Sequence, residues 1–257
     1  MTSSALRPPR SPNVGQTPHD FFRGLYRAFD GLLQASVPAV AKVAGLTGLA
    51  ADSFQGNVRM MRQDEPPLAC HRGCATCCTL RVGATAPEVL QVARFLRLVG
   101  PRLRSRGVDL VAQVRDADAL TRGADEVQRV QMRRACPFVA RGVCIIYEAR
   151  PLACRGHTSH DVKACVDAAA GRRSDVPFSQ SHQWVRAMVQ NALQASVRAA
   201  GLAWGMYELN QGVLLTLDHA DPEGAWLRGE DPLAAALLPD LPLQDMAQAF
   251  DQLLAPD

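Results

Sequence analysis

The chain has 257 residues with a formal net charge of +3, and 47% of its residues are hydrophobic. This length and apolar content suit one domain, or one domain with a helical extension, and exclude disorder of the whole chain. The most apolar stretch, 32–49, is interrupted by Gln34, Pro38 and Lys42, so we expect no membrane span of about 20 residues. Nor do we expect a nucleic-acid partner, because nonspecific binders need a concentrated basic stripe.

The first residues, 1–16, contain several prolines and no hydrophobic period, which predicts a disordered tail. They also lack the apolar core of a secretory signal, which favours a cytoplasmic protein. A helical pattern then begins near His19, where Thr17 and Asp20 form a capping signal. Pro38 predicts the start of a second helix, which Asp64 and the residues after it should end.

After the first cysteines, Thr85 predicts the cap of a helix that Gly100 and Pro101 should close. Less regular helical patterns cover roughly 102–122 and 124–134. Further helices are expected over 181–200, 204–217, 232–238 and 242–254, because their apolar residues recur at spacings of three and four. The segment 136–165 contains prolines and glycines, which predict loops and short turns.

These patterns predict a mainly α protein: a helical domain with irregular cysteine-rich metal-binding segments. We expect N-terminal helices over 17–65, a cysteine-cluster domain over 66–170, and a C-terminal helical region over 178–257 that packs on it.

Eight cysteines are the most informative feature of the sequence, and all lie between positions 70 and 165. A cytosolic chain keeps its thiols reduced, and clustered cysteines there more often bind metal or carry out redox chemistry than form disulfides. The candidate metal ligands are Cys70, Cys74, Cys77, Cys78, Cys136, Cys144, Cys154 and Cys165. We expect the cysteines of 70–78 to converge in space with those of 136–165, because neither stretch has enough core-forming residues to hold its own loop.

The spacing of Cys70, Cys74 and Cys77 is C-x3-C-x2-C, in which a tight loop can aim successive sulfurs at one ion or cluster. Radical S-adenosylmethionine enzymes share this spacing, but their motif follows the first strand of a (β/α) barrel, and no such alternation is visible here. Adjacent residues such as Cys77 and Cys78 rarely reach one tetrahedral ion together. The sequence is therefore compatible with two four-thiolate sites, or with one site and spare thiols.

The double cysteine of CHRGCATCC, followed by CPF and then by G-x-C-x-I-Y-E-x-R-P-x-x-C-R, resembles the YkgJ-type cysteine-cluster family, described as a zinc- or iron-chelating domain. The resemblance covers about 70–165. It implies that the seven cysteines from Cys70 to Cys154 form the chelating set, and Cys165 matches a less regular position. The first spacing departs from the C-x2-C of many relatives.

Residues between the cysteines have their own interpretations. Arg150 and Arg155 fall on motif positions and should stabilise the negative charge of a thiolate-bound metal. For Tyr147 we expect packing in the core, and for Glu148 an ion pair with one of these arginines. His157 and His160 are within reach of a metal at Cys154, although exposed loop histidines are the more common outcome.

The sequence thus predicts a protein that chelates zinc or iron, or a [4Fe-4S] cluster, through its cysteines and acts in metal handling or electron transfer. Two other classes are compatible with it. One is a cluster-supported enzyme, since the family's cysteine motif also occurs in flagellin lysine N-methylases. The other is a structural zinc module whose helices bind another protein, with Trp184, Trp204 and Trp226 as candidate contacts, although tryptophans at helical spacing more often belong to the core.

Overall fold

The structure is a computed structural model that describes residues 17–173 and 175–255. The tail expected over 1–16 lies outside the described residues. Within them the fold is 62% helical, with 11 α-helices and only short strands, which confirms the predicted mainly α class. None of the described helices is both long enough and apolar enough to cross a membrane.

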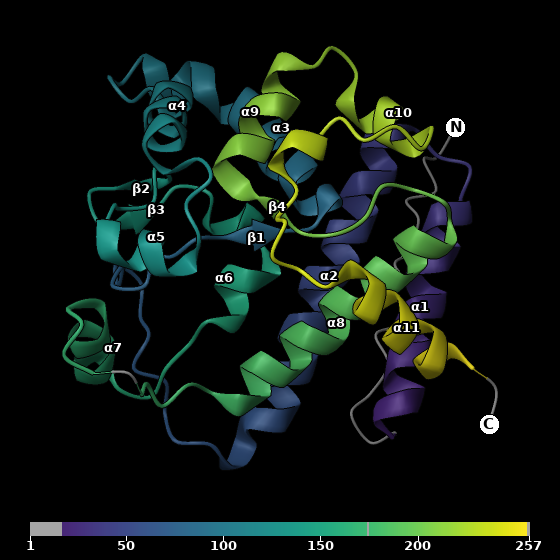
Figure 1. Cartoon of the computed structure of the whole chain (residues 1–257), viewed down its shortest axis with the longest axis horizontal. Helices are drawn as coiled ribbons and strands as arrows, with labels where there is room; N and C mark the ends of the chain where they lie inside the picture. The colour runs from purple at the N-terminus through teal and green to yellow at the C-terminus, as the bar shows by residue number, and fades with distance from the viewer. Residues whose placement is uncertain (1–16, 174, 256–257) are drawn as a thin grey trace, which may run out of the picture.

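The largest helical layer consists of α1 (Pro18–Gln34), α2 (Ala39–Met61) and α8 (Gln180–Ala199), which pack against one another (Figure 1). The helix α1 begins as predicted, because the Thr17 side chain accepts a hydrogen bond from the Asp20 backbone N–H at 3.2 Å. Its apolar face is fully buried, and Phe21 stacks on Trp184 of α8 with ring centroids 5.5 Å apart. Pro38 directly precedes α2, as expected.

The helix α3 (Ala86–Arg104) begins with the predicted capping box of Thr85 and Glu88. Its predicted end is wrong, because the helix continues through Gly100 and Pro101 for another turn. Proline removes only one backbone N–H, and so close to the end of a helix this costs a single internal hydrogen bond. A short 3-10 turn, η1 (Arg62–Asp64), links α2 to the cysteine segment.

The patterns over 102–134 overestimate the helices there, because α4 (Leu110–Thr121) and α5 (Glu126–Met132) are shorter than predicted. Each begins at an aspartate, Asp109 or Asp125, whose side chain accepts backbone N–H groups of the first turn. The side chains that cap these helices therefore determine where they begin.

The expected helix over 204–217 is only partly correct. Residues before α9 (Leu209–Asp218) form the strand β4 (Tyr207–Glu208), which pairs antiparallel with β1 (Gly83–Ala84). The C-terminal part adds α10 (Pro222–Leu227), which the sequence did not predict, then η3 (Ala234–Ala236) and α11 (Leu243–Leu254). Trp226 is completely buried and donates its indole N–H to the Ala203 carbonyl at 2.8 Å, and Trp204 lies against Phe250.

The middle segment contains more regular structure than the loops predicted for it. A hairpin of β2 (Val139–Ala140) and β3 (Val143–Cys144) precedes η2 (Tyr147–Ala149), and the short helices α6 (Leu152–Gly156) and α7 (Val162–Ala169) follow. These elements lie beside the helical layer, with α7 at the edge of the molecule (Figure 1).

The helix α6 is held at both ends by longer helices. The buried Glu88 carboxylate of α3 accepts the Leu152 backbone N–H at 2.6 Å, as well as the Thr85 backbone N–H and hydroxyl. At the other end, Gly156 lies so close to α8 that an added Cβ would stand 2.8 Å from the Cβ of Arg186. The position of Cys154 within α6 is therefore determined by both α3 and α8.

We expect Gly156→Ala to lower the free energy of unfolding by about 1–3 kcal/mol, because the added methyl group must push α6 away from α8. Gly48→Ala is the matched control: Gly48 lies within α2 with no atom near its added Cβ, and alanine favours helix there. Urea denaturation of both variants measures the difference. Equal midpoints for the two variants would contradict the close packing of α6 on α8.

Candidate metal centre

The two cysteine segments lie side by side, as expected. The Cys136 backbone N–H donates to the Cys78 carbonyl at 2.6 Å, which joins the start of the second segment to the end of the first. A second connection runs from the Ala69 N–H to the Ser159 carbonyl at 2.9 Å. The two segments are therefore fixed to each other by backbone hydrogen bonds.

The first thiol group consists of Cys70, Cys74, Cys77 and Cys165. Three of these residues lie in successive turns, in which Cys74 N–H bonds to the His71 carbonyl and Gly73 adopts a φ of +92° that favours glycine. Burial raises the pKa of Cys70, and electrostatic interactions with Cys77, Cys74 and Cys165 raise it further. Cys165, on α7, thus lies near thiols that precede it by almost 90 residues or more.

The second thiol group consists of Cys78, Cys136, Cys144 and Cys154. Burial raises the pKa of Cys136 to about 11, and interaction with Cys144 also raises it. Burial likewise raises the pKa of Cys154, which interacts with Cys136 and Cys144. We include Cys78 in this group because its carbonyl accepts the Cys136 backbone N–H, although its thiol interacts with Cys77.

Cys77 interacts with both groups. The adjacent Cys78 raises the pKa of Cys77 most strongly, while Cys70 and Cys154 each interact with Cys77 electrostatically. All eight cysteines are free thiols. In the described part of the chain, no three His, Cys, Asp or Glu side chains stand close enough to hold a metal ion as they are. The thiols of each group are therefore near one another, but they are not arranged as a complete set of metal ligands.

The surroundings of Arg150 indicate whether a negatively charged metal centre fits beside these thiols. Its buried Nε has no hydrogen-bond partner, and its guanidinium lowers the pKa of Cys77, Cys144 and Cys154. Arg150 as a whole is only partly buried, but a cation with a buried, unused donor is costly unless an anion lies beside it. A thiolate-bound zinc or iron-sulfur centre carries such negative charge, so the donor set and its surroundings fit a metal.

Arg155 contacts the backbone of the segment that carries Arg150. Its Nε donates to the Arg150 carbonyl at 3.0 Å and its Nη2 to the Glu148 carbonyl at 2.6 Å. It therefore braces the backbone that carries Arg150. The charge of Glu148 also acts on Arg155 and raises its pKa, although burial lowers that pKa more strongly.

Arg129 is a residue that sequence reasoning missed. It is 4% exposed, its Nε and Nη1 have no partner, and it lowers the pKa of Cys136 and of Glu208. No motif marks it, because it lies outside the cysteine spacing. It lies seven positions before Cys136, and this proximity in the sequence is the one signal that could have found it.

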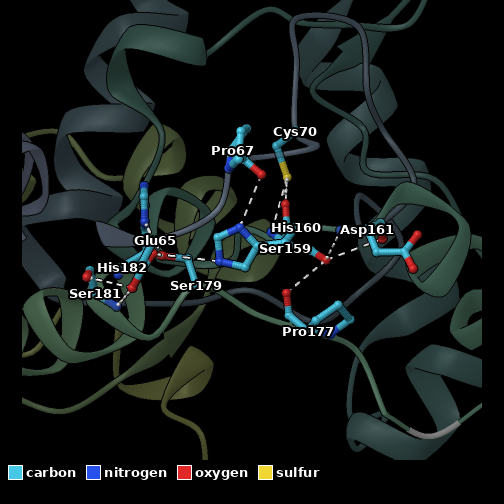
Figure 2. A network of polar contacts seen from close by, with 10 residues as sticks. All are labelled: Glu65, Pro67, Cys70, Ser159, His160, Asp161, Pro177, Ser179, Ser181 and His182. Atoms are coloured by element: carbon cyan, nitrogen blue, oxygen red, sulfur yellow. Dashed lines mark hydrogen bonds and ion pairs between the residues drawn. The ribbon is translucent and has the colours of Figure 1, made fainter. Parts of the chain in front are cut away.

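The aromatic and histidine residues of the segment also differ from expectation. Tyr147 is 46% exposed, not packed in the core, and Arg150 lies 4.0 Å above its ring centroid. His157 is partly buried against Phe178, and burial lowers its pKa. His160 contacts the Pro67 carbonyl and the Glu65 carboxylate (Figure 2).

Taken together, these features define a helical protein with a cysteine-rich middle segment whose thiols gather in two groups, a class suited to thiophilic metal ions. Residues 69–175 match the CxxCxxCC family, described as "Putative zinc- or iron-chelating domain". This match agrees with the resemblance seen in the cysteine motif of the middle of the chain. The match includes all eight cysteines and less than half of the chain. No curated protein and no solved structure matches the chain.

Proposed function

We propose that this protein binds zinc or iron at two centres, one at each thiol group, and acts in metal handling or electron transfer. The observation that carries the proposal is the gathering of the thiols: Cys70 interacts with Cys74, Cys77 and Cys165, and Cys154 interacts with Cys136 and Cys144. We assign four thiols to each centre on this basis. Four thiolates are the usual ligand number for structural zinc and for iron-sulfur clusters. In this proposal 66–170 form the metal-binding domain, and the helices of 17–65 and 178–257 pack on it.

The protein's own groups would prepare each centre in a defined way. Burial keeps the thiols of Cys136 and Cys154 protonated at neutral pH, so binding must release protons. Arg150 and Arg129 supply positive charge beside the sulfurs that become thiolates. Once bound, the metal would supply a stable cross-link between the two segments, and iron would add one-electron chemistry.

We favour iron, as a [4Fe-4S] cluster, over zinc at the first thiol group. The spacing C-x3-C-x2-C recurs in cluster proteins, whereas structural zinc usually takes paired C-x2-C units. The exposed Cys70 places this group near the surface, where metal exchange or electron transfer with another molecule is possible.

Anaerobic purification followed by metal analysis, sulfide analysis and a visible spectrum tests this proposal. We expect iron and acid-labile sulfide in comparable amounts, with visible absorption from the cluster. A colourless preparation with stoichiometric zinc and no sulfide would show that the bound metal is zinc and not iron. A preparation that contains neither metal, and takes up neither after reconstitution, would contradict metal binding altogether.

A further inference from the structure

Glu65 joins the segment before the first cysteine to the beginning of α8 (Figure 2). One carboxylate oxygen accepts the Ser179 hydroxyl at 2.5 Å. The other accepts the Ser181 backbone N–H at 2.8 Å and the Ser181 hydroxyl at 2.6 Å. An anionic side chain is favourable at this end of a helix, where N–H groups point outward.

The charge of Glu65 is stable in this position. Partial burial favours the protonated acid, but hydrogen bonds from Ser179 and Ser181 and the neighbouring His160 outweigh it, and the pKa falls to about 2. The carboxylate is therefore ionised at any physiological pH. Ser179 is itself completely buried and also bonds to His182 Nδ1 at 2.7 Å, so the anchor point on α8 is rigid.

A second set of contacts runs from Glu65 to Cys70. His160 Nε2 lies 3.7 Å from Glu65, and Nδ1 lies 3.2 Å from the Pro67 carbonyl, which can only accept, so Nδ1 carries a proton. The adjacent Ser159 donates its backbone N–H to the Cys70 sulfur at 3.4 Å. Ser159 is 1% exposed, so this donor has a fixed direction.

The segment 66–70 depends on these contacts for its position. It contains two prolines and no helix or strand of its own, and Cys70 at its end is exposed. Ordering such a segment costs about 1–2 kcal/mol of backbone entropy per residue. Contacts at Glu65, Pro67 and Ala69 hold it at alternate residues.

We propose that Glu65 is a positioning residue for metal binding. It connects the segment 66–70 to the N-terminus of α8 and so holds the Cys70 sulfur in place for the first thiol group. The inference rests on the proposed function for its link to metal. The hydrogen bonds of Glu65, not its contact with any sulfur, carry this role.

Glu65→Gln in the full chain tests the proposal, because glutamine keeps the shape but presents an amide N–H₂ where one serine needs an acceptor. With zinc alone as the probe, we expect the affinity of one of two zinc equivalents to fall about 10- to 100-fold, as for other residues that orient ligands. In the metal-free protein we expect faster alkylation of Cys70, mapped by peptide mass spectrometry.

Asp109→Asn is the matched control, since it makes the same carboxylate-to-amide change at the N-terminus of α4, where Asp109 accepts two backbone N–H groups. It should change neither the zinc affinity nor the alkylation of Cys70. An equal loss of zinc affinity in both variants, or weaker binding of both zinc equivalents in Glu65→Gln, would show that Glu65 only stabilises the fold. Either result would overturn the proposal.

The alkylation measurement keeps this inference separate from the proposed function. If the wild-type protein binds neither zinc nor iron, the proposed function fails. If Cys70 in Glu65→Gln is alkylated at the wild-type rate, the positioning by Glu65 is wrong, whatever the metal does.

Discussion

Cys136→Ser is expected to remove the metal of the second thiol group and to leave metal bound at the first thiol group. A serine hydroxyl stays protonated at neutral pH and is a poor ligand for soft metals, so this centre is left with three thiolates. Since a complete zinc site contributes folding free energy on the order of 10 kcal/mol, even partial loss should be measurable as a lower unfolding midpoint. Metal per chain should fall to about half of the wild-type value if there are two four-thiolate sites.

Cys74→Ser should remove the complementary half of the metal. Ala135→Ser controls for a new hydroxyl beside Cys136, because Ala135 is exposed and this variant keeps all eight thiols. Circular dichroism must show unchanged helix content in each variant. If Cys74→Ser and Cys136→Ser both keep the wild-type stoichiometry, the chelating role is wrong. If either one alone loses all metal, there is one shared centre instead of two.

Removal of the metal by a chelator should increase hydrogen exchange mainly over 66–82 and 136–165. These segments have short elements, and only Phe138, Ile146 and Leu152 of them belong to the buried hydrophobic core, so ordering them must offset about 1–2 kcal/mol per residue of backbone entropy with little apolar burial. The helix α8 has a continuous buried face and α9 packs on α3, so both should stay protected without metal.

Hydrogen exchange with mass spectrometry, before and after chelation, measures this difference by peptide. Peptides from α2 serve as the internal control, because this helix packs on α8 and α3 and carries no cysteine. Uniform deprotection of the chain would mean that the metal supports the whole fold. No deprotection at the cysteines would place the metal elsewhere.

The sequence predicted the long helices well, because their apolar residues repeat at the helical period and their caps are explicit, as at Thr17 and Thr85. The sequence prediction failed where contacts between distant parts of the chain determine the secondary structure. The strand β4 forms because Tyr207 pairs with Ala84 across the molecule, and a pattern confined to 204–217 cannot show that partner.

For the candidate metal centre, spacing identified the thiols but not their division into groups. The proposed division depends on how α6 and α7 are placed, and α6 is fixed by Glu88 and Gly156 through long-range contacts. Arg129 and Glu65 were missed for the same reason, since neither lies in the cysteine motif. Tyr147 was misassigned because aromatic character alone does not distinguish a buried ring from one covered by Arg150.

The seating of α6 between α3 and α8 has a consequence for the order of events during synthesis. A nascent chain that has just passed Cys165 already carries all eight thiols, yet the helix against which Gly156 packs has not been made. Glu65 also lacks its hydrogen-bond donors at the start of α8 until Ser179 and Ser181 have left the ribosome. Stable metal insertion is therefore expected after synthesis of α8, so the apo chain must pass through a stage in which its thiols are complete but unprotected.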